Sequence, residues 1–136
     1  MIREVFIFGA AGLGIEVAFT AALDFIQTRK DKHLMGYSSI WYWPLYASAP
    51  LILDKIGPFL FPLPLLVRGL CYTICFMIME YCGMGILRLL LGQSPSEKSY
   101  YRSRWNIHGL TRLDFAPAYC LLGFIFEWLY RGMRPV

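Results

Sequence analysis

The stretch that decides the fold runs from Val5 to Phe25 and reads VFIFGAAGLGIEVAFTAALDF. Two structures fit it. An apolar run followed by the G-x-x-G-x-G pattern at 9–14 is typical of a strand, a glycine turn and a helix that bind a dinucleotide. The same residues also predict one continuous apolar helix that is long enough to cross a bilayer. In that second case, Glu16 and Asp24 are carboxylates at membrane depth.

Composition favours the membrane helix. The 136 residues are 57% hydrophobic and only 16% charged, with a mean hydropathy of +0.49, whereas soluble domains carry about 25% charged residues. A dinucleotide fold needs several βαβ units and an acid about 20 residues after the glycines, at the end of a second strand. That region is TRKDKHLMGY (28–37), a polar connector. We therefore reject the dinucleotide fold.

Four apolar stretches approach the length of a spanning helix, which needs about 20 mostly apolar residues. They run over about 5–26, 39–56, 65–91 and 113–130. The second is short and rich in aromatic residues, and the third is the longest. The sequence predicts an all-α polytopic membrane protein: a four-transmembrane-helix bundle in which residues 1–136 form a single transmembrane domain.

Three connectors join the expected helices, and their charges predict an orientation. GPFLFPLP (57–64) has three prolines, so we expect an interfacial hairpin that continues neither helix. The connectors at 28–37 and 92–112 share one side of a four-span protein and carry the larger basic charge, which places them in the cytoplasm and both termini outside. We expect the net charge of +4 to meet anionic lipid headgroups rather than nucleic acid, with contacts from Arg29, Lys30, Lys32, Arg102 and Arg104.

Two stripes follow the first expected helix at four-residue spacing. Small residues form a ridge that would let another helix approach closely. A polar stripe lies almost opposite, because an offset of two positions turns a helix by about 200°. Neither face suits lipid, so we expect protein on both sides of this helix. The ridge consists of Ala10, Gly14, Ala18 and Ala22, and the polar stripe of Gly12, Glu16, Thr20 and Asp24.

The third expected helix carries Glu80 near its middle. Arg68 is about 18 Å and Arg88 about 12 Å away along the helix axis, so neither is a natural ion-pair partner, and both could reach the headgroups instead. We expect Glu80 to be neutral, cation-bound, or hydrogen-bonded by aromatic hydroxyls and indoles. It should face the bundle interior at the same depth as Glu16, within reach of that acid or of a shared hydroxyl from Thr20, Tyr46 or Tyr72.

The aromatic stretch SSIWYWPLY (38–46) has two interpretations. It resembles the belt of Trp and Tyr found at membrane interfaces. Alternatively, Trp41 and Tyr46 face inward and bind the buried acids. In the fourth helix, Glu127 stands four residues before Arg131, the favourable order for a helical ion pair. The candidate intramembrane polar site is therefore Glu16, Thr20, Asp24, Trp41, Tyr46, Tyr72, Glu80 and Asp114.

The four cysteines, at 71, 75, 82 and 120, all fall inside expected helices. Three of them share a helix face and could in principle hold a soft metal ion. No C-x-x-C pair and no nearby histidine supports this, so we interpret them as small buried packing residues. Nor does the sequence contain a Walker loop or a G-x-S-x-G elbow. It predicts no metal, no cofactor and no catalytic residue.

Residues spread along the chain, from Glu16, Thr20 and Trp41 to Arg68, Glu80 and Glu127, form motifs. These motifs resemble those of the transmembrane protein 229 group, together with bacterial CmpB-like proteins labelled type IV ABC-transporter permeases. The resemblance covers nearly the whole chain and implies a small multi-span membrane protein, without supplying a mechanism. In one place the chain departs from it: bacterial relatives tend to have Trp-Asp-Tyr where this chain has Trp105-Asn106-Ile107. The matching positions include Glu16, Phe19, Thr20, Ser39, Trp41, Tyr46, Arg68, Tyr72, Thr73, Glu80, Leu87, Arg88, Gly109, Asp114, Gly123 and Glu127.

Three functions are compatible with this sequence. The first is a permease-like or channel-like subunit that moves a proton, cation or small solute past Glu16 and Glu80. The second is a non-catalytic accessory subunit of a larger membrane complex, whose acids only lock helix packing. The third is a membrane-embedded enzyme acting on lipid. Four short spans enclose little volume, so we expect a homo-oligomer or other membrane subunits as partners.

Overall fold

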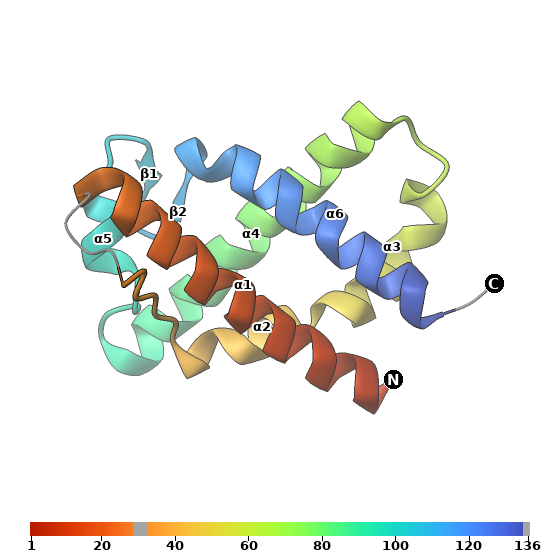
Figure 1. Cartoon of the computed structure of the whole chain (residues 1–136), viewed down its shortest axis with the longest axis horizontal. Coiled ribbons are helices and arrows are strands. Elements are labelled where there is room, and N and C mark those ends of the chain that lie inside the picture. Colours follow the sequence, from red (N-terminus) through yellow and green to blue (C-terminus); the bar gives the residue numbers. More distant parts are fainter. Residues whose placement is uncertain (29–32, 135–136) are drawn as a thin grey trace. The chain divides into compact units, whose positions relative to one another are not determined.

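The computed structural model describes residues 1–28 and 33–134. Two compact units make up the chain, Met1–Leu51 and Ile52–Val136, and each is described by itself. Figure 1 shows the elements, which follow in the order α1 (Ile2–Thr28), η1 (Ile40–Tyr42), α2 (Trp43–Ala47), α3 (Ala49–Leu60), α4 (Leu65–Leu91), α5 (Glu97–Tyr101), β1 (Asn106–Ile107), β2 (Thr111–Arg112), η2 (Leu113–Phe115) and α6 (Ala116–Met133).

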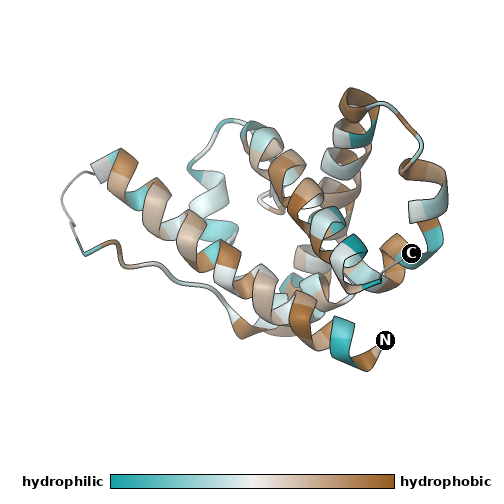
Figure 2. Ribbon diagram, turned by 45° about the vertical axis from the view of Figure 1, so that its right-hand side comes forward, coloured by the Kyte–Doolittle hydropathy of each residue, from teal (hydrophilic) through white to brown (hydrophobic). Residues whose placement is uncertain are grey.

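Within residues 1–28 and 33–134, three helices are long and apolar enough to cross a membrane: Ile2–Gln27, Leu65–Leu91 and Leu113–Met133. They correspond to the first, third and fourth expected spans, which are thereby confirmed as long apolar helices. In Figure 2, apolar residues prevail along these helices and are interrupted by hydrophilic ones. The mainly helical class is confirmed, with a hairpin of two-residue strands as the exception.

The expected second span at 39–56 is wrong as one continuous helix. It is divided among η1, α2 and α3, and the 12 residues of α3 are about 18 Å long, well short of a hydrocarbon core of about 30 Å. Pro44 and Pro50 stand at the starts of α2 and α3, where each lacks the backbone N–H that would continue a helical ladder. A four-span bundle is therefore not seen in the part of the chain that the structure describes.

This break also weakens the expected orientation. If only α1, α4 and α6 cross the membrane, the connectors at 28–37 and 92–112 lie on opposite sides of it. Their basic residues then no longer add up on one side, so the charge rule favours neither orientation clearly. Arg29, Lys30 and Lys32, expected at lipid headgroups, lie outside the described residues.

The proline-rich segment at 57–64 differs in part from the expectation. α3 continues through Gly57 as far as Leu60, with Pro58 inside the helix, at the cost of one bond to the carbonyl four residues earlier. The chain turns only after Leu60. α4 then begins after Pro64, whose carbonyl accepts the Arg68 backbone N–H at 2.9 Å.

The connector at 92–112 is folded. Gly92 ends α4 in the left-handed conformation, with φ 80°. α5 follows, and then a hairpin pairs Ile107 with Thr111. Both central residues of its turn have positive φ, 55° at His108 and 69° at Gly109, as tight hairpin turns require. A Cβ at Gly109 would also lie 2.6 Å from the Tyr101 ring, so this position needs glycine.

In the first unit, α2 packs along α1 (Figure 1). The close approaches are made at Gly9, where a Cβ would lie 2.3 Å from the Trp43 indole nitrogen, and at Gly12, where it would lie 2.1 Å from the Tyr46 ring. The small-residue ridge does not take part in these close approaches. Ala10, Gly14, Ala18 and Ala22 are exposed, and a Cβ at Gly14 would meet open space. Contact through this ridge with another chain stays a prediction.

In the second unit, α4 and α6 cross and contact each other (Figure 1). Gly123 allows the two helices to approach closely. A Cβ atom at this position would lie only 2.4 Å from the Cβ of Tyr72. Phe76 meets Phe126 edge to face at 5.7 Å between ring centroids. Phe126 is almost wholly buried. This pair of helices carries a partly buried acid, Glu80, and a buried one, Glu127.

Candidate functional site

Glu16 lies in the first unit, bound by hydroxyl groups. Its Oε2 accepts hydrogen bonds from the Tyr46 hydroxyl at 2.9 Å and from the Ser38 Oγ at 3.1 Å. Tyr46 comes from α2, and Gly12 of α1 makes room for its ring. The carboxylate therefore fastens the segment that follows α1 back onto that helix.

Thr20, one turn further along α1 than Glu16, also contacts the segment that follows this helix. Its hydroxyl donates to the Tyr37 carbonyl at 2.9 Å and accepts the Tyr37 backbone N–H at the same distance. Glu16 and Thr20 thus both face the chain at 37–46, whereas Asp24 is exposed. Trp41 is half exposed at 49%, and its backbone N–H bonds the Ser39 hydroxyl.

Glu80 lies in the second unit, where hydroxyls from three elements converge on its carboxylate. The Tyr100 hydroxyl of α5 donates to Oε1. The Thr111 hydroxyl of β2 donates to Oε2 at 2.8 Å, and so does the Tyr119 hydroxyl of α6. No described Lys or Arg forms an ion pair with this acid. Among the described residues, the partners of Glu80 are two aromatic hydroxyls, of the kind expected from the sequence, and the hydroxyl of Thr111, which was not expected.

Arg112 is the cation whose field reaches Glu80. Its guanidinium is already occupied: Nε donates to Asp114 Oδ1 at 3.0 Å and a second nitrogen binds Oδ2. The same group lies over the Phe115 ring at 3.9 Å. Asp114, one of the expected site residues, therefore acts as the partner of Arg112, at the edge of the Glu80 site.

Glu127 of α6, with 5% exposure, is more deeply buried than Glu80. Its Oε2 lies 3.0 Å from Arg68 Nε and accepts the Tyr72 hydroxyl at 2.6 Å. Its Oε1 lies 2.9 Å from a nitrogen of Arg131. The expected i,i+4 pair with Arg131 is confirmed, and Arg68 and Tyr72 complete a charge-compensated cluster.

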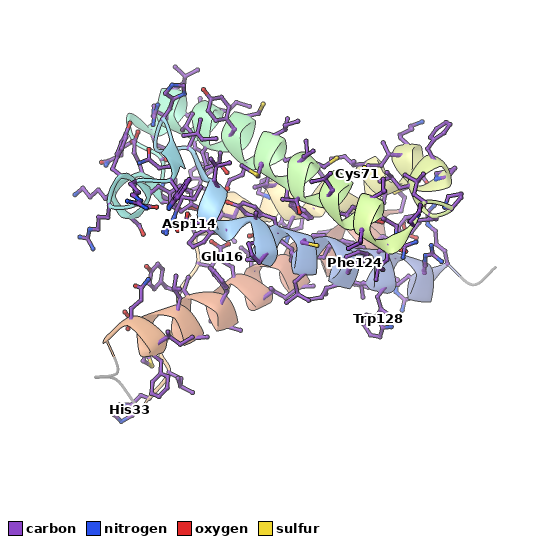
Figure 3. The ribbon with its side chains drawn as sticks, turned by 90° about the horizontal axis from the view of Figure 1, so that it is seen from above. Glu16, His33, Cys71, Asp114, Phe124 and Trp128 are labelled. Carbon is purple, nitrogen blue, oxygen red and sulfur yellow. The ribbon has the colours of Figure 1, made fainter. Side chains whose placement is uncertain are left out.

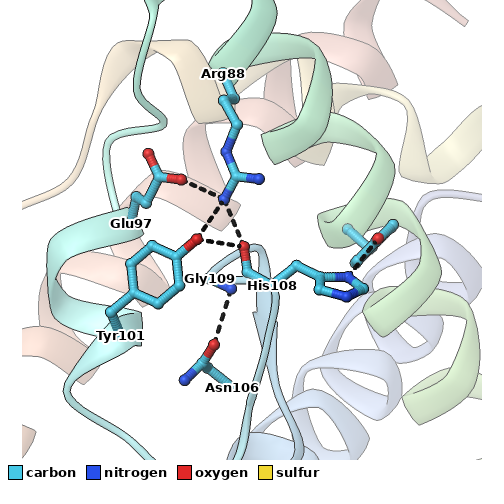
Figure 4. Close-up of polar contacts among 7 residues, drawn as sticks. Arg88, Glu97, Tyr101, Asn106, His108 and Gly109 are labelled. Atoms are coloured by element: carbon cyan, nitrogen blue, oxygen red, sulfur yellow. Dashed lines mark hydrogen bonds and ion pairs between the residues drawn. The ribbon is translucent and has the colours of Figure 1, made fainter.

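Two expectations about α4 are corrected here. Tyr72 binds Glu127, not one of the two expected acids. Arg88 does not extend to lipid headgroups: it pairs with Glu97 and donates to the His108 carbonyl and, at 3.4 Å, to the Tyr101 hydroxyl (Figure 4). A guanidinium has five donors in a fixed fork, so it can fasten several parts of a folded connector to one helix.

Asn106 stabilises the hairpin. Its Oδ1 accepts the Gly109 backbone N–H at 2.9 Å (Figure 4), and its Nδ2 donates to the Ser103 carbonyl. An aspartate could make the first bond but, when ionised, not the second.

The expected headgroup contacts in this connector are Arg102 and Arg104, both exposed. Arg104 lies over the Trp105 ring at 5.4 Å. At the other end of the unit, Trp128 points away from α6 in Figure 3 and is 75% exposed. Such an exposed aromatic residue on an apolar helix is typical of contact with lipid or another chain.

All four cysteines are free. Within the described ranges, no group of three or more His, Cys, Asp or Glu side chains is arranged to hold a metal ion.

Two acids that the sequence led us to expect together belong to different units: Glu16 to the first and Glu80 to the second. Each has its own hydroxyl partners. The sequence signal that could have found the Glu80 partners is weak, since Tyr100 and Thr111 come from a polar connector without periodicity. Tyr119 and Glu127 recur at helical spacing on α6, as do Arg68 and Tyr72 on α4. The sequence signal for contacts between these two helices was therefore clearer than the signal for Tyr100 and Thr111.

Comparison with known proteins gives no match to a family model, to a curated protein or to a solved structure.

Proposed function

We propose that this chain is a permease-like membrane subunit in which the Glu80 carboxylate takes up and releases a positively charged species during transport. The observation that carries the proposal is the set of partners around Glu80: three hydroxyls from α5, β2 and α6, and no arginine or lysine ion pair among the described residues. Its neighbour Glu127 has two arginines.

The physical reason is charge compensation. A carboxylate taken out of water is costly unless it is paired, protonated or bound to a cation. Even on the most lenient scale, a charged side chain at the centre of a bilayer costs about 2.5–3.5 kcal/mol. Hydroxyl donors offset part of this cost but add no charge. Among the acids of this unit described above, Glu80 is thus the one at which an added proton or cation is most favourable.

Arg112 does not remove that preference. Its charge is shared with Asp114 through two hydrogen bonds, so the field that it exerts at Glu80 is largely that of a neutral pair. Because Asp114 is partly exposed, solvent weakens the field further.

The proposal is tested by flux into vesicles. The purified protein is reconstituted with a pH-sensitive dye inside, and a potassium diffusion potential, negative inside, drives cations inward. Wild type should acidify the interior or, with a cation-sensitive dye, import a small cation. Glu80→Gln should keep the fold, because Gln resembles the neutral acid, and should abolish the flux. Glu4→Gln, which alters a pair with the N-terminus at 4.0 Å, is the matched control and should transport normally.

Two results would contradict the proposal. One is equal flux through wild type and Glu80→Gln when both show the same helicity and elution volume. The other is the absence of protein-dependent flux for the proton, sodium and potassium alike.

A second function, an accessory subunit, is favoured by a different observation. An open apolar groove of about 320 Å³ follows α4 and is lined by Ile74, Met77, Ile78, Tyr81, Cys82, Ile107 and Thr111. An apolar groove on such a helix suits a neighbouring transmembrane helix. A photo-crosslinker at Ile78 should then capture a second membrane chain, and Glu80→Gln should leave assembly intact. Crosslinks to lipid alone would count against this function.

We also propose membership of the transmembrane protein 229 group. What supports it is that motif residues bind one another: Tyr46 binds Glu16, and Tyr72 and Arg68 bind Glu127. The same proposal includes residence in a membrane (the cell membrane if the source is bacterial), assembly as a homo-oligomer or with other membrane subunits, and a cytoplasmic connector at 92–112. Cysteine labelling at Ser96 in intact cells tests the orientation, and labelling from outside would overturn it.

A further inference from the structure

Three oxygen atoms of the Glu80 site form a closed triangle. Thr111 Oγ1 lies 2.8 Å from Glu80 Oε2 and 3.3 Å from the Tyr119 hydroxyl. The third side is the hydrogen bond between Tyr119 and the same Oε2. Between Thr111 and Tyr119, either oxygen can be the donor. Tyr100 stands outside the triangle, on Oε1.

We infer that the species bound at Glu80 is a proton, not a metal cation, and that the Thr111–Tyr119 pair accommodates it by turning hydroxyl hydrogens. This rests on the proposed function, in which Glu80 is the group that exchanges charge. The inference adds the substrate class and two positioning residues, Thr111 and Tyr119.

The hydrogen atoms balance in both states. With Glu80 ionised, Thr111 and Tyr119 both donate to Oε2. When a proton from water forms an O–H bond at Oε2, this new group donates to the Tyr119 oxygen. The Tyr119 hydrogen turns to Thr111, and Thr111 continues to donate to Oε2. No non-hydrogen atom has to move, and release of the proton reverses the rotation.

A metal ion fits this arrangement poorly. Ca²⁺ and Mg²⁺ need about six or more oxygens around one point, at about 2.0–2.6 Å from it. Here the hydroxyls are in direct hydrogen-bond contact with the carboxylate, so their hydrogens occupy the space where a cation would have to sit. Displacing Thr111 and Tyr119 would leave Glu80 as the sole charged ligand, because Asp114 is bound to Arg112.

Every charged or titratable group known to face Glu80 fits the inference. Tyr100 from α5 donates to Oε1, Tyr119 comes from α6, and Arg112 from β2 is paired with Asp114 of η2. The proton on Oε2 leaves Oε1 as the carbonyl oxygen. Tyr100 then donates to a C=O group, whereas Tyr119 contacts the C–OH group. This asymmetry can be measured.

Infrared difference spectroscopy of the full chain in nanodiscs, between acidic and alkaline buffer, tests the inference. Acidification should produce the carbonyl stretch of a protonated carboxyl, and Glu80→Gln should remove it. Tyr100→Phe should move this band to higher frequency, because its carbonyl oxygen loses a donor. Tyr119→Phe should move it less. Adding sodium, potassium, calcium or magnesium ions at constant pH should leave the band unchanged.

The outcomes separate the inference from the proposed function. A band that a metal ion removes overturns the proton inference while leaving cation transport intact. A larger shift in Tyr119→Phe than in Tyr100→Phe places the proton on Oε1 and overturns the triangle. No titrating band assigned to Glu80 also overturns it. A titrating Glu80 in a protein without any flux supports the inference and contradicts the proposed transport.

Discussion

Glu80 and Glu127 occupy the same pair of helices and are bound in opposite ways. Glu127 has Arg68, Arg131 and one hydroxyl as partners, so its charge is balanced within the chain. Glu80 has three hydroxyls and no described ion pair. Glu127 is also the more deeply buried of the two. From the difference in the charge of their partners, we propose a structural role for Glu127 and an exchanging role for Glu80.

The largest expected effect is on stability, when each of the two acids is neutralised in a separate variant. Glu127→Gln leaves Arg68 partly buried without its counter-ion, so we expect a loss of about 3–5 kcal/mol in the free energy of unfolding. Glu80→Gln removes no ion pair, and its amide oxygen can still accept hydroxyl donors, so we expect a loss of about 1 kcal/mol. Unfolding of the purified variants in mixed micelles, followed by circular dichroism, measures both values.

Equal losses in the two variants would show that the charge of the partners does not distinguish the two acids. A double variant, Arg68→Gln with Glu127→Gln, provides a second test. Removing both charges should be less harmful than Glu127→Gln alone, because no unpaired charge then remains buried.

A second effect, about 1–3 kcal/mol, is expected from overpacking at the crossing. In Gly123→Ala the new methyl would lie 2.4 Å from Tyr72, so the ring must move and its bond to Glu127 weakens. Gly132→Ala, on the same helix, meets nothing within 4 Å and should be neutral or slightly stabilising. Thermal unfolding of the two variants gives the contrast. A neutral Gly123→Ala would mean that α4 and α6 do not approach this closely.

Gly14→Leu tests the exposed ridge of the first helix. Within one chain the new side chain meets open space, so isolated monomers should unfold like wild type. If the ridge contacts a second chain, the oligomer should dissociate, which analytical ultracentrifugation in detergent would detect. An unchanged oligomer would show that the ridge faces lipid.

The smallest effect concerns a third acid, at the surface. Asp54 of α3 binds Arg134 and, at 3.0 Å, the Tyr130 hydroxyl. The Arg134 contact, followed by that of Tyr130, holds the pKa of the Asp54 carboxyl below its ordinary value of 3.8. A lowered pKa means that this stabilisation is present above the ordinary value and is lost as the pH falls through the lowered one. The unfolding temperature should fall slightly below about pH 4, and less in Asp54→Asn. Identical profiles would show that the pair contributes nothing.

Much of the fold could be predicted from the sequence. Long apolar runs predicted α1, α4 and α6, because a run of about 20 apolar residues is both helical and long enough to span. The one proline in these runs, Pro117, stands in the first turn of α6, where it is tolerated. The run at 39–56 was wrongly predicted to be one spanning helix. Its hydropathy does not reflect the backbone N–H groups that Pro44 and Pro50 lack. The small-residue ridge misled too. A periodic pattern shows which residues share a face, but not which face meets a neighbour.

The candidate site was predicted only in part. Glu16 and Tyr46 are joined as one interpretation of the aromatic stretch proposed. Glu80 was singled out, but its partners were not, since Tyr100 and Thr111 lie 20 and 31 residues further along the chain in an irregular connector. No local sequence pattern identifies such residues, because they meet only after a helix, a loop and a hairpin have folded.

The sequence by itself determined the class of the protein, its long helices and the presence of acids inside them, because hydropathy and helical spacing are properties of neighbouring residues. Only the tertiary structure decided which acid carries its own counter-charge. Arg68 is 59 positions from Glu127 in the chain, and the two meet only where α4 crosses α6. The free energy of a buried charge depends on the groups within a few ångströms of it, and long-range packing places those groups.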